Sequence, residues 1–457
     1  MFDPSGAVVY NLGTVNPPAP QLTPAAAAAN QRVPRRRWVI ASLLGFGVLV
    51  NYFDRVNVSV SQDALHASFG ITTVQFGYLL SAYSWSYALM QIPSGFLLDR
   101  FGVRKIGRIS TLLWSAACFC SAGAFGIRSF FASRLLLGVG EAPTFPGSAK
   151  AVGYWFPRSE RSLATAFFDA AAKLGPAVGV PLIGLLLLHY GWRWSFAATG
   201  IISFVYFLAF TLFYRNPSED KRLTAAERQF IVAGGAHVEA LRDATQPAKR
   251  KVPFAHMLRQ KKVIGLVLGF GSYNYTFYLL LTWLPSYLTN SLGVDLRHSV
   301  LYTSIPWAVG TLTDFFVGGW LVNVLIHRGW DASRVRQTVL VVGTSLGLGI
   351  FGAAYAHTPA VAVFWISVSM GGLSAASPVG WSIPALIAPE RGVGTLGGIM
   401  NSCNQLAAIV APIVTGYIAD RTHSFAWAFA TAAAILVLGI AAYIFWLGRI
   451  EPIPEPA

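Results

Sequence analysis

The stretch GFLLDRFGVRK, residues 95–105, places an Asp-Arg pair, a glycine and a basic pair in the short gap between two long apolar runs. Gly95 would let two helices approach closely, as small residues do in membranes, and Gly102 would permit a tight turn. Asp99 can accept hydrogen bonds from helix N-termini or from an arginine of a neighbouring helix. We therefore expect Asp99 and Arg100 to form a gate on one side of a helical membrane protein.

Composition places most of the chain inside a bilayer. Of the 457 residues, 54% are hydrophobic and 12% are charged, whereas soluble proteins carry about 25% charged residues. Apolar runs close to the ~20 residues that cross a bilayer lie near 38–58, 74–97, 105–127, 130–154, 162–188, 193–214, 263–289, 299–325, 337–356, 360–387, 393–418 and 425–447. Six runs, a polar break and six more predict an all-α membrane protein with twelve transmembrane helices in two pseudo-symmetric six-helix bundles.

The polar break is the only long charged segment, and it divides the chain into parts. We expect a disordered cytoplasmic N-terminal tail, a first bundle, a cytoplasmic linker, a second bundle and a cytoplasmic C-terminal tail, at 1–34, 35–214, 215–262, 263–448 and 449–457. The first part lacks the apolar core of a cleavable signal.

Lysines and arginines fall in alternate gaps between the runs, and none occurs from Val56 to Leu98. The positive-inside rule therefore places both termini in the cytoplasm, and we expect the protein in the cell's inner membrane. The same pattern accounts for the net charge of +15 better than nucleic-acid binding does, because no long basic stretch is interleaved with aromatic residues.

Ionisable residues inside the apolar runs are candidates for function, because charge in a bilayer is costly. Asp54 and Arg55 lie in the first run; Arg134 and Glu141 lie in the fourth, seven residues apart and so on one helix face. A buried carboxylate can exchange a proton, whereas arginine keeps its charge. We expect Asp54 and Glu141 to couple transport to protons, and Arg55 to bind a carboxylate through two parallel hydrogen bonds. Asp54 would hold Arg55 until a substrate or a proton displaces it.

Three further charges lie in later runs. Asp169 and Lys173 are four residues apart on one face, and form either a structural pair or part of a substrate site. Asp314 is either a structural partner or close to a helix end. With four carboxylates and three cations in the runs, the interior carries 3 − 4 = −1. An anionic substrate would increase this negative charge unless carboxylates took up protons, which favours co-transport of an anion with protons.

Several segments resemble the anion:cation symporter family within the major facilitator superfamily, which includes bacterial D-galactonate, hexuronate and glucarate transporters. They are NYFDRVN at 51–57, SAYSWSY at 81–87, GEAPTFP at 140–146, TWLPSY at 282–287 and GGIMN at 397–401. The resemblance covers about 35–449 and implies alternating access between two halves.

The resemblance also implies roles for individual residues. Asp54 and Glu141 match proton-coupling carboxylates, and Arg134 matches the arginine linked to that glutamate. Substrate contacts are implied for Tyr52, Arg55, Tyr87, Trp381, Ser382 and Asn401. One departure is Ala172, which stands where the galactonate-type pattern has a substrate-facing glutamine. The missing amide donor argues against galactonate itself. The adjacent Lys173 suits a second carboxylate or an aromatic acid.

The sequence thus predicts a monomeric, proton-coupled importer of a sugar acid, dicarboxylate or aromatic acid. Gly175, Pro176 and Gly179 leave an antiporter or exporter as the alternative, and a non-transporting membrane sensor is the alternative from another class. No histidine-rich cluster, nucleophile elbow or phosphate-binding loop occurs, so we expect no metal, no cofactor and no enzyme activity.

Overall fold

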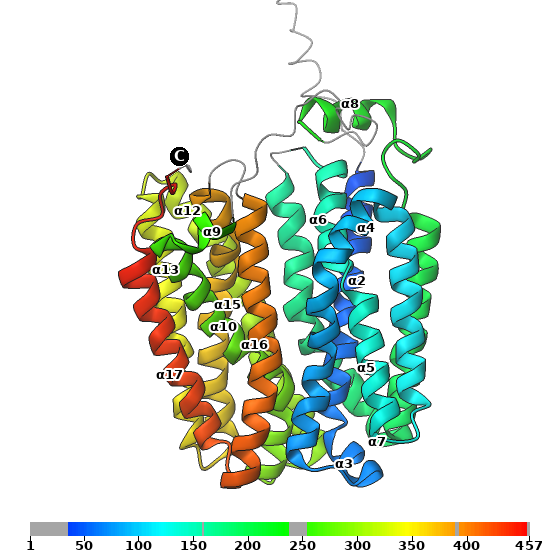
Figure 1. The fold of residues 1–457 in the computed structure, drawn as a ribbon, viewed down its shortest axis with the longest axis vertical. Helices are drawn as coiled ribbons and strands as arrows, with labels where there is room; N and C mark the ends of the chain where they lie inside the picture. Colours follow the sequence, from blue (N-terminus) through cyan, green and yellow to red (C-terminus); the bar gives the residue numbers. More distant parts are fainter. Residues whose placement is uncertain (1–34, 158–159, 237–253, 389–392, 455–457) are drawn as a thin grey trace, which may run out of the picture.

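The computed structural model describes residues 35–157, 160–236, 254–388 and 393–454, and in them every regular element is a helix (Figure 1). The first half contains α2 (Arg36–Val60), α3 (Gln62–Phe69), α4 (Thr73–Ala122), α5 (Ile127–Glu141), α6 (Thr144–Trp155) and α7 (Arg161–Phe213). Between the halves lie α8 (Ala225–Ala233) and α9 (Phe254–Leu258).

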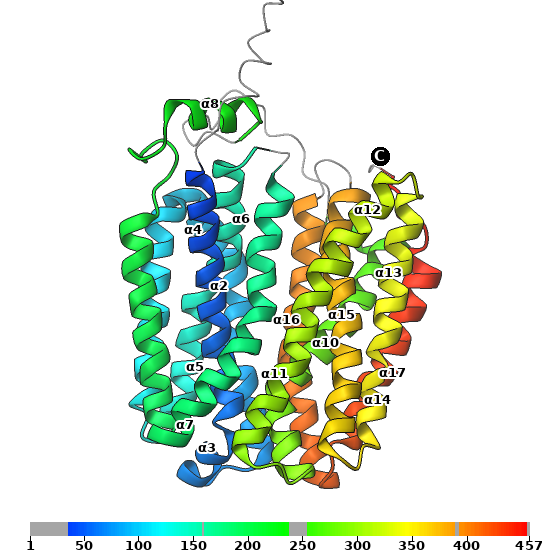
Figure 2. The same ribbon diagram turned by 180° about the vertical axis from the view of Figure 1, so that it is seen from behind.

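The second half begins at α10 (Lys261–Ser286). It continues through η1 (Tyr287–Ser291), α11 (Leu296–Thr313), η2 (Asp314–Leu321), α12 (Val322–His327), α13 (Ala332–Gly347), α14 (Gly349–Ala354), α15 (Pro359–Ile387), α16 (Val393–Thr422), α17 (Ala426–Ala442) and η3 (Tyr443–Leu447). The turned view of Figure 2 shows the two halves side by side.

The membrane-crossing segments agree with the predicted fold. Eight helical stretches in the described residues are long and apolar enough to cross a membrane. Non-helical glycines divide α4 and α7 into two spans each, and α5 continues into α6 as one span. The described part of the chain therefore crosses the bilayer six times in each half, so the prediction of twelve helices in two bundles is confirmed.

Residues with positive φ recur at four equivalent corners, between spans two and three, five and six, eight and nine, and eleven and twelve. They are Gly102 (φ +76°), Gly191 (φ +78°), Gly329 (φ +88°) and His423 (φ +50°). Gly102 combines this φ with ψ 164° and Gly191 with ψ 172°, a region almost restricted to glycine. The predicted tight turn at Gly102 is confirmed.

Gly95 has a different environment from the one predicted. A methyl group at this position would meet no atom within 4 Å, so the prediction that Gly95 brings two helices together is wrong. The close approach occurs instead at Gly140 on α5, where a methyl would lie 2.7 Å from the backbone nitrogen of Trp114 on α4. Glycine is a residue type that is common at helix contacts, but at Gly95 the space beside the helix is open.

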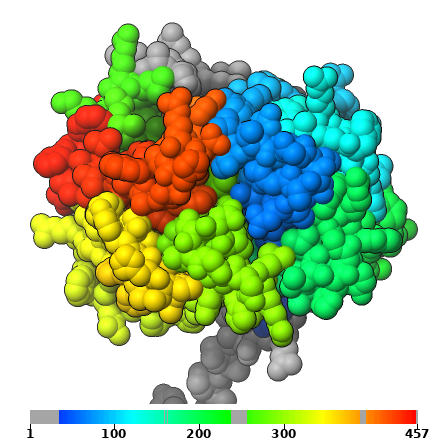
Figure 3. Space-filling model, turned by 90° about the horizontal axis from the view of Figure 1, so that it is seen from below, coloured from blue at the N-terminus to red at the C-terminus, as the bar shows by residue number. Residues whose placement is uncertain are grey.

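The end of the molecule that carries α8 is called here the linker end, and the opposite end, near α3, the distal end (Figure 1). At the distal end the halves are in close contact: a methyl at Gly77 of α4 would lie 2.8 Å from the carbonyl oxygen of Pro412 on α16. Phe76 packs edge-on against Trp283 of α10, with ring centroids 5.7 Å apart. Figure 3, which looks onto this end, shows atoms of the two halves touching.

A second distal contact lies on the other side of the interface between the halves. There Gly184 of α7 leaves just enough room for the buried Val300 of α11. These contacts close the distal end along both sides of the interface.

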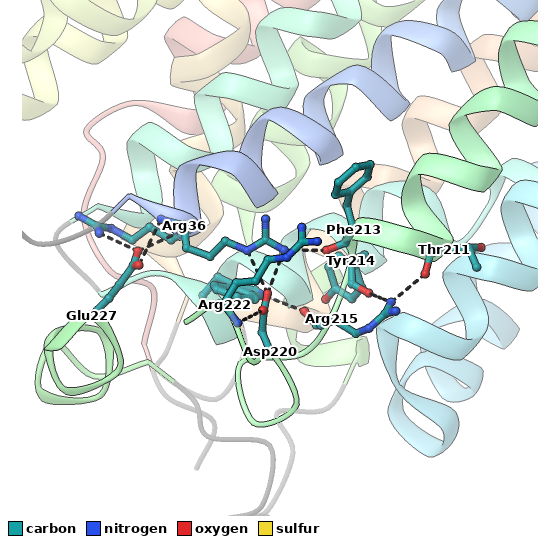
Figure 4. A network of polar contacts seen from close by, with 10 residues as sticks. Arg36, Thr211, Phe213, Tyr214, Arg215, Asp220, Arg222 and Glu227 are labelled. Atoms are coloured by element: carbon teal, nitrogen blue, oxygen red, sulfur yellow. Dashed lines mark hydrogen bonds and ion pairs between the residues drawn. The ribbon is translucent and has the colours of Figure 1, made fainter. Parts of the chain in front are cut away.

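At the linker end, α8 is fastened to the first half by charged hydrogen bonds (Figure 4). Glu227 is fully buried and accepts from the backbone N–H groups of Arg36 and Arg37, at 3.1 and 3.0 Å, and from Arg37 Nη1 at 3.1 Å. Arg36 Nε also donates to Asp220 at 3.0 Å. The predicted linker thus contains a docked helix, whereas the predicted N-terminal tail and residues 237–253 lie outside the described residues.

Candidate functional site

A buried ion pair joins α2 to α5 inside the first half. Arg55 Nε and Nη2 both donate to Oε2 of Glu141, at 3.1 and 3.0 Å, and Glu141 is 0% exposed. The predicted pairing of Arg55 with Asp54 is wrong. Successive residues on a helix point about 100° apart, so Asp54 and Arg55 face different neighbours.

Asp54 contacts α7 through its side chain and α5 through its backbone carbonyl. Its Oδ2 accepts a hydrogen bond of 3.0 Å from Ser203 Oγ on α7, and its backbone carbonyl accepts from Arg134 Nη1 at 3.2 Å. Asp54 and Arg134 are both almost completely buried. The seven-residue spacing therefore does place Arg134 and Glu141 on the face of α5 that meets α2.

Three tyrosine rings surround the guanidinium of Arg55. Its central carbon lies 4.6 Å from the ring centroid of Tyr52, 4.7 Å from Tyr83 and 5.4 Å from Tyr87. Such cation–π contacts stabilise a desolvated arginine and fix its orientation. The structure brings the predicted Tyr52, Arg55 and Tyr87 together and adds Tyr83. The four-residue spacing of Tyr83 and Tyr87 puts both on one helix face and could have indicated it.

Each buried carboxyl group uses only one of its oxygens. Asp54 Oδ1 and Glu141 Oε1 are shielded from solvent, and neither forms a hydrogen bond with the described residues. An unpaired buried oxygen of a carboxylate is costly, and adding a proton lowers that cost by removing the charge. Both groups therefore have a free oxygen that can hold a proton.

A second group of charges spans the two halves. Lys173 Nζ on α7 lies 2.7 Å from Asp169 Oδ2, one turn away, and 2.8 Å from Asp314 Oδ2 at the start of η2. The same ammonium lies 3.5 Å from Ser377 Oγ on α15. Asp314 is thus a partner of Lys173, well inside the eighth span.

Residues 44–371 match the profile described as Major Facilitator Superfamily. The chain belongs to the major facilitator superfamily.

Curated relatives of this facilitator extend over nearly the whole chain. It is 39% identical to the uncharacterized transporter YybO of Bacillus subtilis strain 168, with 91% of this chain and 95% of the relative covered. It is 31% identical to the D-galactonate transporter of Escherichia coli O6:H1, with 91% and 97% covered. The second of these relatives bears out the resemblance to sugar-acid carriers.

A solved structure supports the fold of this facilitator. The bacterial homologue of the human lysosomal transporter Spinster superposes with a TM-score of 0.70 at 16% identity, covering 93% of this chain and 100% of the other. At that identity the likeness shows the fold alone.

The predicted contacts in the second half of the facilitator lie apart from Arg55. Asn401 Nδ2 on α16 donates to Gln91 Oε1 on α4 at 3.1 Å, which links the halves. Ser382 Oγ donates to the Val379 carbonyl of its own helix at 2.7 Å, and Trp381 is 42% exposed. Among the described residues these three side chains form no hydrogen bond or ring contact with the Arg55–Glu141 pair.

Buried polar groups on α10 were not predicted from the sequence. Asn274 Nδ2 donates to Asn404 Oδ1 on α16 at 2.8 Å. An asparagine within an apolar run, in SYNYTFY at 272–278, was the available signal.

The predicted gate at the linker end lies within the first half. Asp99 accepts a 2.6 Å hydrogen bond from Lys150 Nζ on α6, and the same lysine donates to the Leu98 carbonyl at 2.9 Å. The partner is therefore a lysine, not the predicted helix N-terminus or arginine. Arg100 lies over the ring of Phe101, 5.3 Å from its centroid.

Proposed function

We propose that this chain is a proton-coupled symporter that imports an organic carboxylate by alternating access. The observation that supports it best is the Arg55–Glu141 pair. A substrate carboxylate and the Glu141 carboxylate would compete for the same two donors of Arg55, because both donors are already used by one glutamate oxygen.

Proton coupling follows from this competition. When Glu141 takes up a proton, its attraction for Arg55 falls and the guanidinium becomes available to the substrate. Asp54, with its own free oxygen, is the second proton acceptor. Arg134 holds the backbone at Asp54 and keeps the two acceptors on adjoining faces.

The substrate class that we propose is a sugar acid, a dicarboxylate or an aromatic acid. Arg55 supplies one cationic position, and Lys173, which contacts Asp314 of the other half, supplies a second. A relative of this chain is named a D-galactonate transporter. Asp99 and Lys150 would hold the linker end, which we place in the cytoplasm together with both termini.

Uptake by purified protein in proteoliposomes tests this function. The wild type should accumulate at least one labelled acid from a panel of D-galactonate, D-glucarate, succinate and benzoate when the lumen is more alkaline than the outside. Glu141→Gln and Asp54→Asn should each lower this accumulation and keep exchange of internal for external acid. Asp63→Asn, an exposed carboxylate after the first span, is the matched control.

Two results would contradict the proposal. Accumulation by the Glu141→Gln and Asp54→Asn variants at the wild-type level would exclude them as proton acceptors. Accumulation only when the proton gradient is reversed would indicate an exporter.

A further inference from the structure

Asp314 is a third buried carboxylate, and it lies outside the Arg55–Glu141 pair. It is 5% exposed and opens the π-helix η2 inside a membrane span. Short π-helical segments within α-helices are found mainly at functional sites. Its partner Lys173 is 3% exposed and belongs to the other half of the molecule.

The two carboxylates beside Lys173 are held differently. Asp169 accepts an aligned hydrogen bond of 2.7 Å from Lys173 and has a side chain that is 22% exposed. Asp314 Oδ2 is within 2.8 Å of the same ammonium, but it forms no aligned hydrogen bond with the described residues. Asp314 is therefore the more buried of the two carboxylates.

The other groups that face Lys173 are uncharged. Tyr273 of α10 and Tyr52 of α2 lie in its field, and Ser377 of α15 is 3.5 Å away. With one ammonium and two carboxylates the cluster carries +1 − 2 = −1. No cation other than Lys173 pairs with either carboxylate among the described residues, so the cluster keeps this net negative charge between the halves.

We propose that Asp314 takes up a further proton when a substrate carboxylate binds Lys173. This inference rests on the proposed function. A proton from the aqueous phase bonds to a carboxylate oxygen of Asp314, and the substrate carboxylate takes the place of Asp314 beside the ammonium. Release of the substrate reverses both steps, and no other bond is made or broken.

The charge of the cluster explains why the proton is needed. Without it, an added substrate carboxylate would bring the buried cluster from −1 to −2. With a neutral Asp314 the sum is +1 for Lys173, −1 for Asp169 and −1 for the substrate, which restores −1. Burying a second uncompensated charge is costly in a membrane interior.

The position of the pair adds a mechanical consequence. The contact of Lys173 with Asp314 links α7 to η2, so protonation of Asp314 loosens a direct link between the halves. A substrate held by Lys173 then replaces that link. Substrate binding together with protonation of Asp314 would thus allow the two halves to move relative to each other.

The test is the accumulation ratio at equilibrium in proteoliposomes with the membrane potential clamped at zero. For n co-transported protons the ratio is ten to the power n per pH unit, so loss of one proton lowers it about tenfold. The substrate is the acid of the panel that the wild type accumulates. We expect Asp314→Asn to show this tenfold lower ratio per pH unit, and Asp295→Asn to keep the wild-type ratio.

Asp295 is the matched control because it lies at the start of the same span and is 63% exposed. A wild-type ratio in Asp314→Asn would overturn the inference and leave the proposed function standing. A wild type that accumulates no acid would overturn both.

If Asp314→Asn does not fold, Asp314→Glu keeps a carboxyl group and allows an infrared measurement. Substrate addition to the wild type should produce protonated carboxyl bands, and Asp314→Glu should shift one of them. If no band shifts in Asp314→Glu, the protons belong to other carboxyl groups and the inference is overturned.

Discussion

Replacing Gly77 should open the distal end of the molecule. This glycine lies where α4 crosses α16, and a methyl there would be 2.8 Å from the Pro412 carbonyl oxygen. An ordinary contact begins near 3.4 Å, so alanine requires the helices to separate by about 3.4 − 2.8 = 0.6 Å. The obstacle is backbone, which cannot rotate away as a side chain can.

The expected size of the effect follows from the cost of overpacking. One excess methyl in a close-packed interface costs about 1–3 kcal/mol. That cost falls on the state that is closed at the distal end, so the population open at that end should rise about 5- to 150-fold. Gly77→Trp should hold nearly all molecules open.

Accessibility of a cysteine at Val300 reports this opening. Val300 packs against Gly184 on the other side of the interface between the halves and is buried there. A side chain introduced at Gly77 therefore does not contact it. In a background without the three native cysteines, Val300→Cys should react slowly with a membrane-impermeant maleimide. The rate should rise by the stated factor with Gly77→Ala and be highest with Gly77→Trp.

The matched control is Gly95→Trp, on the same helix but with no atom within 4 Å of the position of its Cβ. It should leave the labelling rate unchanged. If Gly77→Trp also leaves the rate unchanged, the contact of Gly77 with Pro412 does not determine distal closure.

Three further variants test other parts of the structure. Arg55→Lys should raise KM about 10- to 100-fold, because a lysine cannot supply two parallel donors between three tyrosine rings; a KM within twofold of wild type would contradict this. Glu227→Ala should cost about 1–3 kcal/mol of stability and speed amide hydrogen exchange in α8, since it removes the buried carboxylate that accepts hydrogen bonds from Arg36 and Arg37; unchanged exchange there would be inconsistent with a docked helix. Gly102→Ala should cost about 1–3 kcal/mol through backbone strain, while Gly95→Ala should leave the thermal midpoint unchanged.

The fold could be predicted largely from the sequence, because span length and charge distribution are properties of short segments. The apolar runs matched the observed spans, and the glycine at 102 gave the turn. The cost of membrane burial also identified Asp54, Arg55 and Glu141 as neighbours of one site. Spacing along a single helix, as for Arg134 and Glu141, was a reliable indicator.

What could not be predicted is which groups pair across helices. Arg55 was assigned to its sequence neighbour Asp54, but it bonds Glu141 on another helix. Lys173 was matched with Asp169 by the four-residue rule, and its second partner Asp314 comes from the other half of the chain. Local periodicity predicts which residues share one face of a helix. It does not predict how that face is oriented toward a helix that is distant in the sequence. Gly95 failed for the same reason, since the residue type does not say what lies opposite.

Four corners with positive φ recur at corresponding places in this protein, and two of them, Gly102 and Gly191, have nearly the same φ and ψ. Gly191 follows Gly102 by 191 − 102 = 89 residues, and His423 follows Gly329 by 423 − 329 = 94. Arg104, beside the first corner, pairs with Glu219 near α8, whereas Trp192, beside the second, donates to Ser68 next to the opposite surface. The same hairpin geometry is therefore built once at each water boundary by consecutive three-span modules inserted in opposite senses. Because this corner occurs at both membrane surfaces, backbone geometry determines which residue stands there. The compartment that the corner faces does not.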